Sequence, residues 1–228
     1  MLLIDLDESS IRQLNQQLHQ PTAANESWQI KNPRGKHNIA VGMMTPATIQ
    51  IDGHVGYYCG GMNQLATLQI NGNAGSGVAE NIMSGRIQVK GSASQYAAAS
   101  GQGGLVVIEG DASSRCGISM KGVNIVVGGS VGHMSAFLAQ KGCLVICGDA
   151  GDNLGDSLYE AVIYVRGTVS SLGAGCVEKE MKTQHITQVD TLLKQAGISA
   201  DPMTFRRYGS TREHYYFHSM HLKETVSG

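Results

Sequence analysis

The stretch TIQIDG at residues 48–53 recurs every nineteen residues, as TLQING, RIQVKG, LVVIEG, NIVVGG, CLVICG and VIYVRG from residues 67, 86, 105, 124, 143 and 162. The second and fourth residues of every copy are aliphatic, which predicts a strand with one buried face. Each copy ends in a glycine: Gly53, Gly72, Gly91, Gly110, Gly129, Gly148 and Gly167. The repeat runs over 48–180 without a visible insertion or deletion, so the sequence predicts a stack of equivalent units.

One short strand cannot bury its face alone, whereas stacked copies can pair in register. We therefore expect an all-β fold, a single-stranded parallel β-helix of about seven 19-residue coils, right-handed because of strand twist. With neighbouring strands about 4.8 Å apart, the column would be roughly 34 Å long. The residue before each glycine should face outward, and the glycine should turn the chain with a positive φ. A second position holds only Gly or Ala and predicts a tight inward corner: Gly60, Ala79, Ala98, Gly117, Ala136, Gly155 and Ala174.

The flanking segments are expected to close the open ends of the column. Residues 1–47 should form an N-terminal cap, with a helix that includes Leu14 and Leu18 and an irregular lead-in over 22–47. Residues 48–180 are the β-helix, and residues 181–228 should form a C-terminal helix ending at Gly197, followed by a basic and aromatic tail. We expect that tail to run over the outside of the column or to contact a partner.

The bulk properties exclude several classes of function. The formal net charge of −1 gives no electrostatic reason to expect nucleic acid or an acidic membrane surface as partner. No stretch approaches eighteen apolar residues, and the N-terminus lacks a basic start and a long apolar run, so neither a membrane span nor a signal peptide is predicted. The five scattered cysteines suit a reducing compartment, which predicts a cytoplasmic protein.

The cysteines are the first candidates for chemistry. Cys59 and Cys116 share a coil position three coils apart, on the order of 14 Å, which is too far for a disulfide. Cys143 and Cys147 have C-x3-C spacing, but no second pair completes a zinc site or an iron–sulfur cluster. We therefore expect buried or surface thiols.

Two other motifs favour structural interpretations. The stretch GNAGSG at residues 72–77 resembles part of a phosphate loop, but no crossover helix follows it and its first two glycines recur in other copies. A structural turn is the better explanation. His214, His218 and His221 could share a helix face, yet no carboxylate has matching spacing, so a surface or interface role is expected rather than a metal site.

Paired carboxylates would be required in a carbohydrate-cleaving β-helix. Asp111 and Asp149 share a coil position but lie two coils apart, about 10 Å, and no long loop walls a groove beside them. The sequence around the Ser, His, Asp and Cys residues does not match a Ser-His-Asp or Cys-His catalytic motif either. The sequence therefore predicts no catalytic, cofactor-binding or metal-binding residue in this chain, and a solenoid wall suited to binding flat protein surfaces.

The G-x-x-G turns GHVG, GNAG, GSVG and GDAG, each preceded by an aliphatic strand, resemble the GXGXG β-helix domain of glutamate synthases. The same domain occurs as a subunit of formylmethanofuran dehydrogenases. Longer stretches are similar to the stand-alone GXGXG subunits of N-methylglutamate synthases, the methylamine–glutamate N-methyltransferases: RGKHNIAVG (34–42), GHVGYYCGGMN (53–63), GVAENIMSG (77–85), GGLVVIEGDASSRCGISMKG (103–122), VGHMSAFLAQKG (131–142) and FRRYGS (205–210).

This resemblance implies a non-catalytic scaffold subunit in a hetero-oligomer. Its partners would be an amidotransferase-like subunit with an N-terminal cysteine nucleophile and a synthase subunit that carries FMN and an iron–sulfur cluster. The second residue here is Leu2, and the chain is too short for an added flavin barrel of about 250 residues. The complex would convert methylamine and glutamate to N-methylglutamate and ammonia. A subunit of a glutamate synthase or formylmethanofuran dehydrogenase-like complex, and a stand-alone β-helix that binds a ligand or oligomerises, remain as alternatives.

Overall fold

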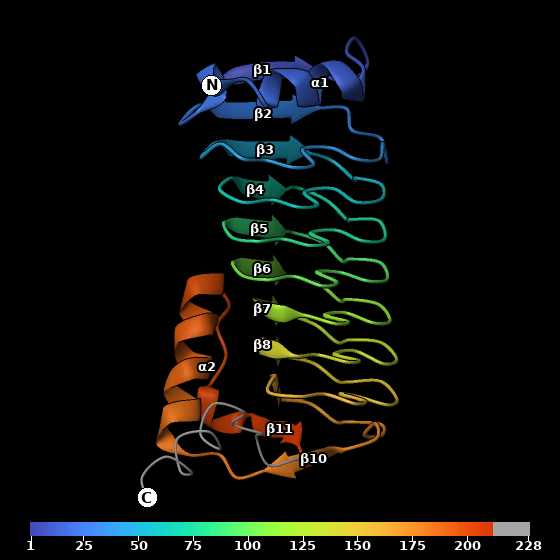
Figure 1. Cartoon of the computed structure of the whole chain (residues 1–228), viewed down its shortest axis with the longest axis vertical. Helices are drawn as coiled ribbons and strands as arrows, with labels where there is room; N and C mark the ends of the chain where they lie inside the picture. Colours follow the sequence, from blue (N-terminus) through green and yellow to red (C-terminus); the bar gives the residue numbers. More distant parts are fainter. Residues whose placement is uncertain (212–228) are drawn as a thin grey trace, which may run out of the picture.

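The computed structural model describes residues 1–211, in which stacked strands form a column (Figure 1). Eleven strands make one sheet in the order β1-β2-β3-β4-β5-β6-β7-β8-β9-β11-β10. They are β1 (Leu2–Asp5), β2 (Ser27–Lys31), β3 (Thr48–Asp52), β4 (Thr67–Ile70), β5 (Arg86–Val89), β6 (Leu105–Ile108), β7 (Lys121–Val127), β8 (Lys141–Ile146), β9 (Val162–Val165), β10 (Cys176–Lys179) and β11 (Arg206–Ser210). The helices are α1 (Ile11–Leu18) and α2 (Thr183–Ala196), with 3-10 turns η1 (Pro21–Ala23) and η2 (Pro202–Thr204). The predicted parallel β-helix of about seven coils, with short helices in its flanks, is confirmed.

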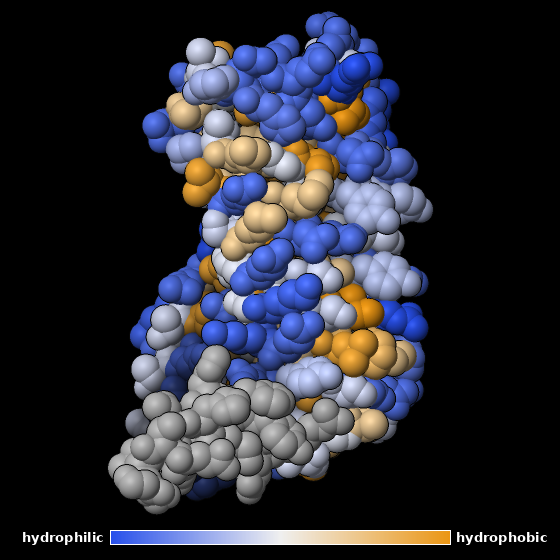
Figure 2. Space-filling model, in the orientation of Figure 1, coloured by the Kyte–Doolittle hydropathy of each residue, from blue (hydrophilic) through white to orange (hydrophobic). Residues whose placement is uncertain are grey.

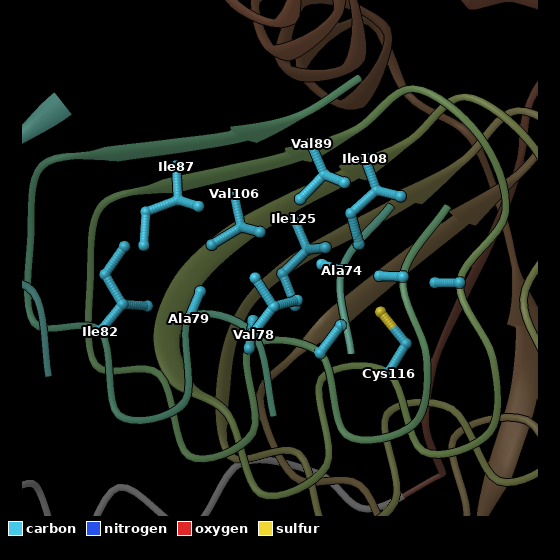
Figure 3. Packing of buried hydrophobic residues seen from close by; sticks show 14 of the residues in the cluster. Ala74, Val78, Ala79, Ile82, Ile87, Val89, Val106, Ile108, Cys116 and Ile125 are labelled. Atoms are coloured by element: carbon cyan, nitrogen blue, oxygen red, sulfur yellow. The ribbon is translucent and has the colours of Figure 1, made fainter. Parts of the chain in front are cut away.

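Strands β3 to β9 pair in parallel with a constant offset of nineteen residues, so that Thr48 lies opposite Thr67 and Leu144 opposite Ile163. We number coil positions from the first residue of each predicted copy, so that Thr48 and Thr67 are both at position 1. The aliphatic side chains at positions 2 and 4 are all fully buried, as predicted. Figure 3 shows strand residues such as Ile87 and Ile125 facing Val78 and Ala79 of the opposite wall. Full burial of each large aliphatic side chain contributes about 1.5–3 kcal/mol to folding.

The position-6 glycines are required by close approach between coils. Of the seven, only Gly53 has a positive φ, of 137°, so the predicted positive φ is wrong for the other six. A Cβ on Gly72 would lie 2.6 Å from the backbone carbon and oxygen of Gly53, which real side chains do not tolerate. Successive glycines are also hydrogen-bonded, with the N–H of Gly110 donating to the carbonyl of Gly91 at 3.0 Å.

Left-handed backbone occurs instead at positions 11, 13 and 15, in the wall opposite the strands. In one coil Tyr96, Ala98 and Ser100 have φ of 63°, 55° and 54°. Their N–H groups point alternately to the two neighbouring coils: Tyr96 donates to Ser114 at 3.1 Å, and Ala98 donates to Val78 at 2.8 Å. The stacking of coils therefore imposes a conformation that only glycine adopts easily on whatever residue is present.

Position 13 combines this left-handed backbone with a shortage of space. A Cβ on Gly60 would lie 2.6 Å from Cδ1 of Ile87, inside the core. Gly or Ala at this position confirms the predicted tight corner, and the structure adds the reason that the backbone there is left-handed in six coils: at Gly60, Ala79, Ala98, Gly117, Ala136 and Gly155.

The N-terminal cap is more regular than predicted. The segment expected to be an irregular lead-in contains β2, which pairs in parallel with β3, and β1 extends the same sheet beyond β2. The offset between Ser27 and Thr48 is 21 residues, so the repeat pattern does not detect β2. Helix α1 begins at the N-cap Ser10, which forms a capping box with Gln13. It buries Leu14 and Leu18 over the end of the column, as predicted.

The C-terminal end departs from the repeat by one residue. Ala150 pairs with Val169 at an offset of nineteen, but Leu154 pairs with Leu172 at eighteen. Gly173 therefore occupies position 13 of the last coil, as its N–H bond to Leu154 shows, and the assignment of Ala174 to that corner was wrong. Strand β11 then pairs antiparallel with β9 and with β10, so this end of the sheet is closed by the chain's own C-terminal segment.

Helix α2 is present as predicted, ending at Gly197 with φ of 71°, and it lies along the outer face of the sheet (Figure 1). Its apolar face packs against position-3 side chains, forming a second buried cluster that includes Val107, Val126, Val145, Tyr164, Val189, Leu192, Leu193 and Phe205. On the uncovered strands position 3 is Gln50, Gln69 and Gln88, all partly exposed. This change from Gln to apolar residues at position 3 indicates which strands the helix covers, and it was not recognised from the sequence. Cys147, expected to face solvent, is buried beneath α2.

No helix within residues 1–211 has the length and apolar character needed to cross a membrane. The structure does not bear on the rest of the tail, residues 212–228.

The close approach of coils at position 6 can be tested at Gly110. We expect Gly110→Ala to lower the free energy of unfolding by about 1–3 kcal/mol, because its Cβ would lie 2.5 Å from Ser92 Oγ and 3.0 Å from the backbone of Gly91. Lys90→Ala, which removes the ion pair between two partly exposed side chains, Lys90 and Glu109, should cost less than about 1 kcal/mol. Urea unfolding measures both. Gly110→Asn tests whether glycine is needed for its conformation or for lack of space, since asparagine tolerates positive φ but has a Cβ. If Gly110→Asn lowers the free energy of unfolding only slightly, the steric explanation is contradicted.

Candidate interaction surface

The candidate catalytic residues considered in the sequence analysis do not lie together in one site. Within residues 1–211, no three His, Cys, Asp or Glu side chains are grouped so that they could hold a metal ion. His214, His218 and His221 lie outside the described residues.

All five cysteines are free, buried thiols. Cys59 and Cys116 point into the core, where burial raises the pKa of each thiol to about 12. Cys143 and Cys147 lie under α2, and burial raises the pKa of Cys143 to about 11. Thiols held protonated in an apolar environment are poor nucleophiles and poor metal ligands.

The paired carboxylates have a structural role at position 7. The carboxylate of Asp111 accepts the N–H of Ser130 at 2.7 Å, and that of Asp149 accepts the N–H of Thr168 at 2.7 Å. The hydrogen bonds from Thr168 lower the pKa of Asp149. The same side-chain ladder, each member capping the next coil, runs through His54, Asn73, Ser92, Asp111, Ser130 and Asp149. The polar residue after each repeat glycine was the signal for this ladder, and its role was not recognised from sequence.

The stretch at 72–77 is a turn of the second coil. A Cβ on Gly75 would lie 2.7 Å from the backbone carbon of Gly56, so this glycine, like Gly72, is explained by coil stacking. The structural interpretation therefore accounts for the glycines of the phosphate-loop-like motif.

The outer face of the sheet beyond α2 is polar and internally hydrogen-bonded. Asp52 accepts hydrogen bonds from the side-chain amides of Gln29, Gln50 and Asn71 at 2.6, 2.8 and 2.7 Å. Burial alone would raise the pKa of Asp52, but these three donors lower it overall. The polar side chains around Asp52 on this face therefore find hydrogen-bond partners without a covering helix.

A groove of about 500 Å³ runs between α2 and the sheet, lined by Asn124, Gln184, Thr187, Gln188, Thr191, Leu192 and Gln195. At its base Tyr164 donates to Gln188 at 2.7 Å, and Gln188 donates to Cys143 Sγ at 3.1 Å. The lining consists of amides, hydroxyls and one leucine, and it contains no side chain suited to proton transfer near pH 7. These contacts hold α2 on the sheet.

The wall opposite the strands carries exposed aromatic residues. We call the large side chains at positions 10 and 11 of the coils the aromatic ridge, which is interrupted at Ser76 and Gly77 in the coil between Tyr58 and Tyr96: His37, Tyr57, Tyr58, Tyr96, Arg115 and Met134. His37 and Tyr57 are stacked with ring centroids 4.4 Å apart, and Tyr58 meets Tyr57 edge-on at 6.5 Å.

The lower part of the ridge is organised around Arg115. Its guanidinium lies 6.0 Å from the ring centroid of Tyr96, and Nη2 lies 3.9 Å from the sulfur of Met134. Tyr57, Tyr58 and Tyr96 are 52 %, 49 % and 37 % exposed. Figure 2 shows one face of the molecule, on which hydrophobic residues are interspersed among hydrophilic ones.

The fold defines a parallel β-solenoid. No family model matches the chain. The chain is 53 % identical over 220 residues to Protein GlxC of Rhizobium meliloti (strain 1021), an alignment that covers 95 % of this chain and 96 % of the relative. It therefore belongs to the same family as GlxC, which is consistent with the resemblance to the GXGXG β-helix proteins related to glutamate synthase.

The buried thiols predict an alkaline loss of stability. Unfolded cysteines ionise near their ordinary pKa of 9.0, whereas Cys59 and Cys116 stay protonated in the folded protein up to about pH 12. The contribution of these protonated thiols to the free energy of unfolding is complete below pH 9. It is lost as pH rises toward 12, by about 1.4 kcal/mol per thiol per pH unit. Urea unfolding from about pH 8.5 to 10.5 should show a shallower decline for Cys59→Ala/Cys116→Ala than for a Ser119→Ala control. Identical slopes would contradict burial of these thiols.

Protonation of His185 should loosen the start of α2. Nδ1 of His185 accepts the N–H of Lys182 at 3.0 Å, which requires a neutral ring. Burial, Arg207 and Lys182 lower the pKa of His185 from 6.5, so this stabilisation is present above pH 6.5 and is lost as pH falls through the lower folded value. Hydrogen exchange of the first-turn amides, corrected for intrinsic rates, should become faster between about pH 7.5 and 5.5. His185→Gln should remove that pH dependence; if it persists unchanged, His185 is not its cause.

Proposed function

We propose that this chain is the scaffold subunit of a glutamate synthase-like complex, and specifically of an N-methylglutamate synthase. The observation that carries the proposal is that the stretches resembling the GXGXG subunit lie in a regular solenoid, in a chain that matches GlxC over nearly its full length. In this proposal the complex transfers the methylamine nitrogen to a glutamate-derived carbon skeleton in the cytoplasm.

The column has the mechanical properties that a scaffold requires. Its core is filled by stacked aliphatic side chains, and a backbone bonded from coil to coil resists bending. The eleven stacked strands, about 4.8 Å apart, make a rigid body roughly 48 Å long. Such a body can hold two other subunits at a fixed separation, so that a nitrogen-bearing intermediate passes between them without escaping into bulk water.

We assign the chemistry to partner subunits. The thiols of this chain do not fit an iron–sulfur cluster, since Cys59 and Cys116 lie in the core while Cys143 and Cys147 lie under α2. In the proposal FMN and the iron–sulfur cluster belong to the synthase-like subunit, and the amidotransferase-like subunit supplies the nucleophilic cysteine. The present chain contributes binding surfaces.

Reconstitution tests this proposal. The tagged chain is co-expressed with the amidotransferase-like and FMN-bearing subunits from the same source, and the purified complex is assayed for N-methylglutamate formed from methylamine and glutamate. We expect a flavin-containing complex whose assembly and activity are lost when this chain is omitted. Replacement of methylamine by ammonia distinguishes a glutamate synthase. Recovery of the chain alone, with neither subunit bound, would refute the proposal and favour a stand-alone binding module.

A further inference from the structure

We propose that the aromatic ridge is the surface on which a partner subunit docks, and that the docked face of the partner is apolar with a carboxylate opposite Arg115. This inference rests on the proposed function and assigns a location to one of its subunit contacts. Three independent features of the ridge support it: its backbone conformation, its exposed area and its charge.

The backbone conformation at position 11 disfavours the residues found there. Tyr58, Tyr96, Arg115 and Met134 have φ of 60°, 63°, 59° and 56°, where a Cβ is strained. The same position is Asn38, Gly77 and Asn153 in other coils, the residue types that tolerate this conformation. Four large side chains therefore occupy sites where asparagine or glycine would be less strained, and all four lie at the surface and not in the core.

The exposed area is comparable to the largest apolar patch on a typical monomer. Met62 and Leu138, at position 15 beside the ridge, are 46 % and 37 % exposed. Together with the three tyrosines they present on the order of 400 Å² of apolar and aromatic surface, within the range of the largest patch on a typical monomer. That is about half of what each partner contributes to a standard interface, the rest being a polar rim. Tyr, Arg and Met are also the residue types enriched at interface centres.

The charge of the ridge selects the kind of partner. Arg115 and Lys36, which is next to His37 in the chain, form no ion pair within residues 1–211. None of the six ridge residues is acidic, and the carboxylates beside the ridge, Glu80 next to Tyr58 and Asp152 next to Met134, each lie two coils from Arg115. A different chain with a carboxylate facing Arg115 satisfies the guanidinium, which is already oriented by Tyr96.

The strain at position 11 supplies a test in which folding and binding change in opposite directions. Tyr58→Asn and Arg115→Asn should leave the melting temperature of the isolated chain unchanged or raise it, because asparagine relieves the backbone. The same substitutions should weaken binding of a purified amidotransferase-like or FMN-bearing subunit, measured by biolayer interferometry on the immobilised full-length chain, by at least tenfold each. Met203→Asn, at a 68 % exposed residue of η2 outside the ridge, is the control and should bind as wild type.

The outcomes separate this inference from the proposed function. If wild type binds a subunit and both ridge variants bind it equally well, the ridge is not the docking surface and the scaffold proposal stands. If wild type binds neither subunit, the proposed function and this inference both fail. If sedimentation shows a dimer of the isolated chain that Tyr58→Asn dissociates, the ridge is a self-association surface and the inference is overturned.

Discussion

The structure depends on hydrogen bonding between coils stacked about one strand spacing apart. The strands form one side of each coil, but the same spacing holds around the whole circumference, including the wall without regular strands. There the N–H groups of positions 11, 13 and 15 reach alternately to the coils on either side. Glycine at position 6, small residues at position 13 and left-handed backbone at alternate positions all follow from this stacking.

The same constraint explains why the polar residues of the repeat serve structure before chemistry. The carboxylates of Asp111 and Asp149 cap the N–H groups of the next coil, as do Ser92 and Ser130. Asp52 is occupied by three amides on the outer face of the sheet. The features that remain available to another molecule project from the column, and the aromatic ridge is one of these.

The strands and their inward residues could be predicted from two periods in the sequence. Burial of one face of a strand places apolar residues at every second position, and the stacking of coils repeats that pattern every nineteen residues. The reason assigned to the position-6 glycines was wrong, because sequence shows that a glycine is needed but not whether conformation or space requires it. Strand β2 was missed because its offset from β3 is 21 residues, and the shift in the last coil was missed because Gly173 and Ala174 are both small. Cys147 was expected to be exposed because the pattern of one strand does not reveal that α2, some forty residues later, covers it.

The sequence alone determined the repeat, its strands, its inward corner, both flanking helices and the resemblance to the GXGXG family. These depend on local periodicity and residue size, which are properties of the chain itself. Only the tertiary structure decided that α2 lies on the sheet, that β11 closes the column between β9 and β10, and that the backbone at Tyr58, Tyr96, Arg115 and Met134 is left-handed. Those arrangements depend on which residues of different coils meet in space, and spacing along the chain does not specify how such surfaces pack.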